Sequence, residues 1–372
     1  MKCLFFIGHP AHFHLFRNVI DALINKKHKV FILIKKKDIL ESLLIESGYT
    51  YTNVLPDGRA DGKIGIAIGI VKKDWELFKF CKKNKPDLML GSTPEISHIG
   101  KLLNIPSIIF SEDDEAIIKN FATITYPFAS HIISPKGCNN GKWNNKTIFY
   151  NGYHKLAYLH PNRFSPNKEI VKRYFPENKN YYLLRFVNLN AYHDDNAKGF
   201  TPDIAHKVIS LLSETGDVYI SSERKLEPKF EKYQLKINPL DIHHIMYYAD
   251  IYLGDSQSMA VEAAMLGTPS VRFSNFIDKI SVLKDIENNY QLTYGIKPNN
   301  QNGLFEKLKE LIHLHDLKNI FQIRRMKMLE EKIDVTAFFL WLIEMYPESI
   351  SIMKENPDYQ IRFLSKNKNT PH

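Results

Sequence analysis

Cysteine is scarce in this sequence. The 372 residues include three cysteines, Cys3, Cys81 and Cys138, which are odd in number, widely spaced and without a CxxC pair. This usage argues against a disulfide framework and against a zinc site, because both need paired or clustered cysteines. It is typical of a reducing compartment, and we expect the protein to act in the cytoplasm.

Long apolar runs are also missing. The first one, Cys3–Ile7, meets Gly-His-Pro after five residues, which is too short for the core of a signal peptide and predicts a first β-strand. No uninterrupted apolar run approaches the roughly 18 residues that span a bilayer. The longest candidate, Ala337–Ile343, is broken by Glu344, and we expect it to form a buried amphipathic helix.

The charge of the chain is basic and unevenly distributed. The net charge is +9 over the whole sequence, and residues 1–154 hold 21 Lys and Arg against 14 Asp and Glu, a net +7. One interpretation is that these lysines lie on solvated helix faces and loop ends. The other is attraction to an anionic surface, either inner-leaflet phospholipid or a polyprenyl-phosphate carrier. No nucleic-acid module surrounds them, so we do not expect nucleic acid as a partner. Much of this charge comes from the clusters Lys26–Lys29, Lys35–Lys37, Lys72-Lys73 and Lys79–Lys85.

Short apolar runs alternate with helical patterns along most of the chain. Such alternation predicts βαβ crossovers and parallel sheets, hence an α/β protein. The length suggests two domains, and the polar, aromatic segment Asn151–Asn167 is the predicted linker. We expect Rossmann-like domains at about 1–155 and 165–333, with a C-terminal helix at about 334–360 that closes the first. The glycine-rich stretch 56–69 is predicted to be a loop followed by a helix. The GxGxxG fingerprint is missing from the first domain, which counts against a nicotinamide cofactor.

One βαβ unit, Asp250–Phe273, carries the strongest functional signal. An apolar strand ends at Gly254, a polar turn follows, and a run of strong helix formers then extends to Gly267. The exposed N-terminus of such a helix offers unpaired N–H groups and a positive dipole end, which suit a phosphate. The alternative is that Asp255 or Ser256 only caps the helix and Glu262 lies on its solvated face.

The order of these pieces resembles the glycosyltransferase-B fold. This fold is shared by nucleotide-sugar glycosyltransferases and by non-hydrolysing UDP-N-acetylglucosamine 2-epimerases, and it has two Rossmann-like domains facing a central cleft. The sequence is most similar to a bacterial and archaeal family called domain of unknown function 354. The motifs that carry this resemblance are GHPAHFHLFRNVI, FSEDDEA, ISSERKLE and YYADIYLGDSQSMAVEAAMLGTPSVRF.

The resemblance implies a nucleotide-sugar donor in the C-terminal domain. The diphosphate would lie on the helix after Gly254, and Glu262 would hold the ribose. For Arg185 there is also an argument that does not depend on the resemblance. An Arg in a strand this apolar needs an anionic partner, either a phosphate or an acid of the protein. The residues implied at the donor site are Arg185, Ser222, Glu223, Arg224, Ser256, Gln257, Ser258 and Glu262.

The N-terminal domain would then hold the acceptor and the catalytic acid or base. His9 and His12 lie in the first β–α turn, where a neutral imidazole could deprotonate a hydroxyl or simply cap the helix. Glu112–Glu115 follow a strand directly, and four carboxylates there repel one another unless they are solvated, bind a cation or share a proton. Asp113 and Glu115 are the candidate bases. No DxD motif is present, so the resemblance implies no metal and no cofactor besides the nucleotide-sugar co-substrate.

Three functions remain open at this point. The first is a metal-independent glycosyltransferase that moves a sugar from a UDP-linked donor to a glycan or lipid-linked acceptor. It would act in surface polysaccharide synthesis at the inner face of the membrane. The second is a nucleotide-sugar 2-epimerase. The epimerase pattern has Gly-Thr-Arg-Pro-Glu after its first strand, whereas this sequence has Gly-His-Pro-Ala-His. The third is a non-catalytic binding protein of an envelope pathway.

Overall fold

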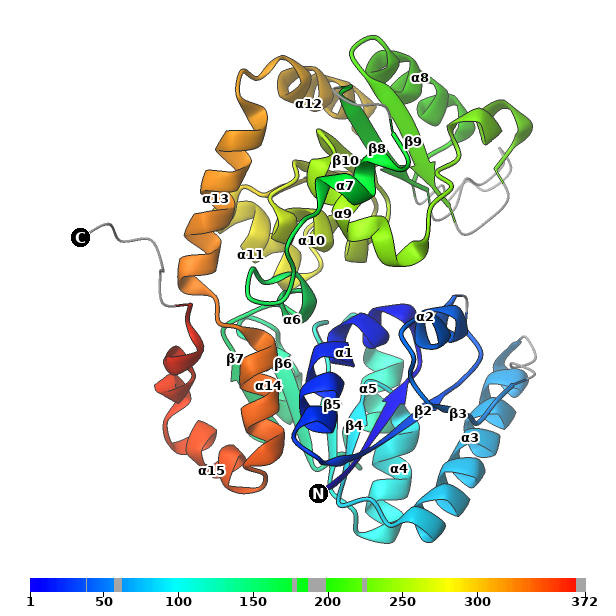
Figure 1. Cartoon of the computed structure of the whole chain (residues 1–372), viewed down its shortest axis with the longest axis vertical. Helices are drawn as coiled ribbons and strands as arrows, with labels where there is room; N and C mark the ends of the chain where they lie inside the picture. The colour runs from blue at the N-terminus through cyan, green and yellow to red at the C-terminus, as the bar shows by residue number, and fades with distance from the viewer. Residues whose placement is uncertain (38, 57–61, 176–178, 187–198, 223–225, 366–372) are drawn as a thin grey trace. The chain divides into compact units, whose positions relative to one another are not determined.

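The chain forms two compact units. The computed structural model describes all residues except 38, 57–61, 176–178, 187–198, 223–225 and 366–372 (Figure 1). Unit 1 comprises Met1–Arg163 together with Lys332–His372, and unit 2 comprises Phe164–Glu331. Residues 151–163, which the sequence assigned to the linker, therefore belong to unit 1.

Unit 1 is built on a parallel sheet. Within the described residues it has seven strands in the order β3-β2-β1-β4-β5-β6-β7, so the order reverses between β1 and β4. The strands are short, and the central ones are mostly buried, as expected when helices cover both faces of a parallel sheet, whereas the edge strand β3 is partly exposed. The strands are β1 (Lys2–Ile7), β2 (Lys29–Ile34), β3 (Thr52–Asn53), β4 (Leu88–Gly91), β5 (Ser107–Phe110), β6 (His131–Pro135) and β7 (Thr147–Tyr150).

Crossover connections between the parallel strands place the helices of unit 1 on two faces of this sheet. Helices α1 (Pro10–Asn25) and α2 (Leu40–Glu46) lie on one face, and α6 (Leu156–Leu159) packs against α1 (Figure 1). The other face carries α3 (Gly62–Asn84), α4 (Pro94–Leu103) and α5 (Lys119–Thr125). A buried cluster that includes Leu77 and Ile96 fills the space between these three helices and the sheet.

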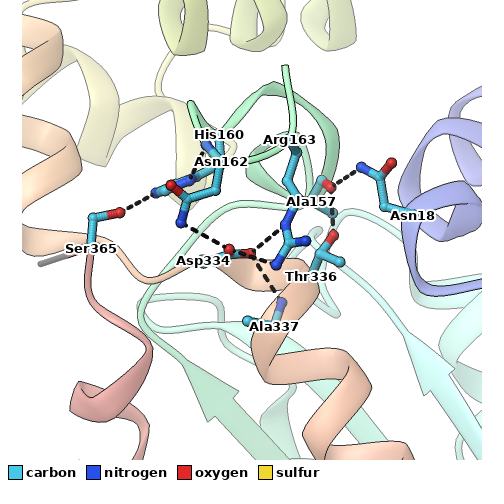
Figure 2. A network of polar contacts seen from close by, with 9 residues as sticks. All are labelled: Asn18, Ala157, His160, Asn162, Arg163, Asp334, Thr336, Ala337 and Ser365. Carbon is cyan, nitrogen blue, oxygen red and sulfur yellow. Dashed lines mark hydrogen bonds and ion pairs between the residues drawn. The ribbon is translucent and has the colours of Figure 1, made fainter. Parts of the chain in front are cut away.

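The returning C-terminal segment completes unit 1. It consists of α14 (Val335–Glu344), α15 (Glu348–Glu355) and the 3₁₀ turn η4 (Pro357–Phe363), where the sequence predicted one helix at about 334–360. Asp334 caps α14 by accepting a hydrogen bond from the Ala337 N–H at 3.0 Å. Arg163 donates to the same carboxylate at 2.7 and 3.1 Å, and Thr336 donates to the Ala157 carbonyl (Figure 2). These contacts tie the two ends of unit 1 together, although they are far apart in sequence.

Unit 2 has a smaller parallel sheet of the same kind. Its order, within the described residues, is β12-β11-β10-β8-β9, which reverses between β10 and β8. The strands are β8 (Tyr181–Arg185), β9 (Asp217–Ser221), β10 (Ile251–Gly254), β11 (Ser270–Phe273) and β12 (Thr293–Ile296). The main helices are α7 (Lys168–Lys172), α8 (Pro202–Ser213), α9 (Ile242–Tyr248), α10 (Gln257–Leu266), α11 (Ser281–Tyr290), α12 (Gln301–His313) and α13 (Leu317–Glu331).

Two parallel sheets with crossover helices confirm the predicted α/β class and its two Rossmann-like domains. In the described part of the chain, no helix is both long enough and apolar enough to cross a membrane. The segment Ala337–Ile343 forms most of α14 and is largely buried, as predicted. The glycine-rich stretch differs from the prediction, because α3 begins at Gly62 rather than after Gly69.

Candidate functional site

The reversal of strand order in unit 2 lies between Arg185 and Gly254. Arg185 is the last residue of β8 and pairs with Gly254, the last residue of β10. A Cβ at Gly254 would lie 2.6 Å from the Arg185 carbonyl oxygen, so only glycine allows the two strand ends to approach this closely. Ligands of open α/β sheets bind at such reversal points.

Helix α10 begins at this strand end. Ser256 is its N-cap and accepts from the Met259 N–H at 3.4 Å, and Gly267 ends the helix with φ of 72°. Gln257 and Ser258 form the first turn and are partly exposed. The capping interpretation of Ser256 is therefore correct. The hydrogen bond engages one N–H, and the positive end of the helix dipole remains at the edge where Arg185 lies.

Arg185 lies in a polar environment at this edge. The side chain is buried, and one guanidinium nitrogen donates to the Ser221 hydroxyl of the neighbouring strand β9 at 3.2 Å. Ser222 follows directly and is partly exposed. Glu223 and Arg224, which were also predicted at the donor site, lie outside the described residues.

Glu262 is buried one turn into α10, not on a solvated face. Its carboxylate lies 3.6 Å from the Nε2 atom of His243, a buried residue of α9. Asp255, the other candidate cap of α10, is not the N-cap; its carboxylate lies against Gly199, where a Cβ would be 2.9 Å away.

A second arginine of unit 2 escaped the sequence analysis. Arg272 on β11 is almost fully buried, pairs with Glu287 of α11, and lies 3.5 Å from the side-chain oxygen of Gln257. It braces the first turn of α10 from the opposite side to Arg185. The argument that identified Arg185, an Arg inside an apolar strand, applies equally to Arg272 and could have found it.

Unit 1 gathers ionisable groups at the carboxyl ends of its strands. His9 is the N-cap of α1, and its Nδ1 accepts from the Ala11 N–H at 3.1 Å, so the capping interpretation holds for His9. His12 lies one turn further on. A Cβ at Gly8 would lie 2.8 Å from Thr93, so the turns after β1 and β4 meet beside His12.

The four carboxylates that follow β5 divide into two pairs. Asp114 accepts from the Asn139 N–H at 2.8 Å, and Glu115 lies against Gly141, so both support the loop after β6. Glu112 instead forms an ion pair with the buried Lys155. Asp113 lies within electrostatic reach of both Glu112 and Lys155.

His154 and Lys155 complete the group, and the sequence analysis had placed both in the linker. The Nδ1 atom of His154 lies 3.7 Å from Glu112, and its ring stacks on Tyr150 with centroids 6.3 Å apart. His12 is in electrostatic contact with His154 and Lys155. We call His12, Glu112, Asp113, His154 and Lys155 the acid–base cluster.

Burial sets the protonation of this cluster. It lowers the pKa of His12 to about 3, with the neighbouring His9 and His154 adding to the effect, and it lowers the pKa of His154 to about 4. Both imidazoles are therefore neutral at pH 7. Burial alone would raise the pKa of Glu112, but Lys155 and His154 bring it below its usual range. Burial, together with the charge of Glu112, raises the pKa of Asp113 to about 6.

The chain belongs to the family described as protein of unknown function DUF354, whose model matches residues 2–292. No curated protein sequence matches significantly. Among the solved structures, MnaA of S. aureus in complex with UDP is 14% identical, with a TM-score of 0.67 over 94% of this chain and 98% of that one.

Two further solved structures have the same architecture. The UDP-GlcNAc 2-epimerase of Methanocaldococcus jannaschii is 14% identical, with a TM-score of 0.60 over 88% of this chain and 99% of that chain. The spinosyn rhamnosyltransferase SpnG, complexed with thymidine diphosphate, is 11% identical, with a TM-score of 0.60 over 91% and 99%. At these identities the comparisons establish the glycosyltransferase-B fold, as the sequence predicted.

Proposed function

We propose that the protein is a glycosyltransferase that takes a sugar from a nucleoside diphosphate, with UDP as the expected carrier. The observation that supports this most is the meeting of Arg185, Gly254 and the N-terminus of α10 at one edge of the unit 2 sheet. A guanidinium and a helix N-terminus together favour a diphosphate over a singly charged ligand.

In this proposal the same groups that bind the diphosphate also assist its departure. Negative charge builds up on the diphosphate as the bond to the sugar breaks, and preorganised donors stabilise that charge. Ser256, Gln257 and Ser258 would contact the phosphates, with Ser222, Glu223 and Arg224 beside the nucleotide. Glu262 would bind the ribose, in exchange for part of its contact with His243.

Asp113 is the proposed base that deprotonates the acceptor hydroxyl. A general base works best with a pKa near the working pH, and the pKa of Asp113 is about 6, against about 3 for His12. His12 then acts as a neutral hydrogen-bonding group, and Lys155 holds Glu112 ionised. We no longer propose a catalytic role for His9 or Glu115, because His9 caps α1 and Glu115 supports a loop.

Nucleotide-sugar 2-epimerisation is the second candidate. The fold shared with the epimerases favours it, as does the number of ionisable groups in the acid–base cluster. Transfer to an acceptor needs one proton removed, whereas epimerisation at C2 needs a proton removed and another returned. Asp113 with a pKa of about 6 suits one such step, and the two neutral histidines are poor partners for the other.

Mass spectrometry of the purified protein with a panel of nucleotide sugars separates these candidates. We expect the nucleotide to be released when a glycan or polyprenyl-phosphate-linked acceptor is added. A C2 epimer formed without acceptor would support the second candidate. If no nucleotide sugar binds, both enzyme functions are wrong and a non-catalytic envelope protein remains.

The setting that we propose is surface polysaccharide synthesis in the cytoplasm, at the inner face of the membrane. The reaction as proposed needs neither a metal nor a cofactor. Its acceptor, a glycan or a polyprenyl-phosphate-linked saccharide, would bind to unit 1, which is basic.

A further inference from the structure

Helix α3 carries apolar side chains on two faces. Its inner face packs into the core through Leu77 and Cys81, which are fully buried. On the outer face, Ile68, Val71 and Trp75 follow one another at helical spacing and are 51%, 67% and 59% exposed. A helix that packs on a sheet needs only one apolar face. The second apolar face of α3 therefore indicates a surface that binds something outside unit 1.

The outer face continues onto the neighbouring helices. Trp75 stacks on Phe78 at 5.8 Å, and a groove of about 640 Å³ runs between these rings and α4. Leu102 of α4, 65% exposed, and Phe128, 43% exposed, line its far side. Large exposed apolar side chains of this kind, gathered over α3, α4 and the turn after α5, mark an interaction surface.

Lysines surround this groove. Lys82 lies over the Phe78 ring with its Nζ 5.7 Å from the centroid, and Lys101 of α4 lines the groove itself. The acids of the same face are engaged, because Asp74 pairs with His98 at 3.0 Å and Glu76 with Lys79 at 2.7 Å. Where exposure is described on α3 and α4, the exposed lysines are Lys72, Lys79, Lys82, Lys83 and Lys101.

We propose that this surface, which we call the α3–α4 face, docks the protein onto an anionic phospholipid membrane. Trp75 and its apolar neighbours would enter the interfacial layer, where tryptophan is favoured. The lysines would lay their alkyl chains along the apolar groove and direct their ammonium groups at lipid phosphates. A second copy of the chain fits poorly, because a two-fold contact would bring the same lysines face to face.

The inference rests on the membrane setting of the proposed function and deepens it by naming the surface that meets the lipid. Because membrane docking can be measured without any nucleotide sugar, a failure of docking is distinguishable from a failure of the proposed reaction. The experiment is co-sedimentation of the full chain with phosphatidylcholine vesicles, with and without phosphatidylglycerol. We expect binding to the anionic vesicles alone, weakened by added salt. Equal binding to both vesicles, or binding to neither, would overturn the proposal.

Matched variants test the surface itself. Trp75→Ser should weaken binding roughly tenfold, and Lys72→Glu roughly fivefold or more, because each lysine near a charged surface contributes about that factor. The controls are Ile45→Ser on α2, where Ile45 is 64% exposed, and Lys354→Glu on α15. These two control variants should bind the vesicles as the unchanged protein does. An equal loss of binding in the controls would mean that the effect does not depend on the α3–α4 face, and would contradict the proposal.

Two further readouts keep the test decisive. Thermal melting monitors folding, and Val71→Ser replaces Trp75→Ser if that variant is unfolded. Light scattering monitors self-association, and a dimer that is lost in Trp75→Ser while lipid binding is unchanged would assign the face to a second copy instead.

Discussion

The two units use different chemistry at the same place in the same kind of sheet. At the carboxyl edge of unit 2 lie hydroxyls, a helix N-terminus and a guanidinium, groups that bind an anion by hydrogen bonds and positive charge. At the carboxyl edge of unit 1 lie carboxylates and imidazoles whose pKa values burial has moved. Permanent charge is suited to binding an anion, and titratable groups are suited to moving a proton. The two units share a fold, and the side chains at the sheet edge suit unit 2 to binding an anion and unit 1 to moving a proton.

Asp113→Asn tests this division with the largest expected effect. We expect turnover to fall about 10²- to 10⁴-fold, the usual contribution of a general base, while nucleoside diphosphate binding changes little. Steady-state kinetics and calorimetric binding measure the two quantities. Glu115→Gln is the matched control, because Glu115 lies against Gly141. Equal losses in both variants would contradict the assignment of Asp113.

Asp113→Asn should also stabilise the fold at pH 7. The pKa of Asp113 is raised from 3.8 to about 6, so the folded protein binds a proton more tightly than the unfolded chain does. Stability from this group is therefore present at low pH and is lost as the pH rises from about 4 to 6. The expected gain for Asn is about 3 kcal/mol at pH 7, which follows from the rise of the pKa from 3.8 to about 6, and it disappears below pH 4. Denaturant unfolding at both pH values measures it.

Asp334→Ala tests whether damage to the fold of unit 1 leaves the proposed binding site of unit 2 intact. Unit 1 depends on a returning segment, and Asp334 both caps α14 and pairs with Arg163 (Figure 2). Its loss should cost about 3 kcal/mol, because Arg163 and a helix N-terminus lose their partner. Denaturant unfolding measures this cost. Nucleoside diphosphate binding under native conditions should be kept, and its loss would break the proposed separation of tasks.

Arg185→Ala tests the other half of the comparison. Nucleoside diphosphate affinity should fall about 10- to 100-fold, as expected for the loss of a charge-assisted hydrogen bond of about 1.5–3 kcal/mol. Arg185→Lys should recover part of the affinity, since it keeps the charge without the fork of donors. Calorimetry measures both variants. An unchanged affinity in Arg185→Ala would place the anion site elsewhere.

The smallest expected effect is a shift in the pH profile. Activity should rise with pH through about 6 as Asp113 loses its proton. Lys155 holds the pKa of Asp113 down, so Lys155→Met should move the rising limb of kcat/KM to higher pH. A pH profile with an unchanged midpoint in this variant would contradict the proposed effect of Lys155 on the pKa of Asp113.

Local patterns were sufficient to predict most of the strands, the start of α10 and the position of Arg185, but not β7 or β12. Each depends on neighbouring residues: apolar runs, a serine before a helix, an arginine in an apolar strand. The acid–base cluster was predicted only in part, because Glu112 and Lys155 are 43 positions apart and meet through the order of strands in the sheet. Glycines at the start of α3 suggested a loop, and the tertiary packing of that helix overrides their low propensity.

Calorimetric titration of UDP into three proteins tests the central claim most directly. The unchanged protein and Asp113→Asn should bind UDP with affinities within about twofold of each other, and Arg185→Ala should bind at least about tenfold more weakly. Equal binding by Arg185→Ala, or no binding of UDP or another nucleoside diphosphate by the unchanged protein, would contradict the assignment of unit 2 as the donor site.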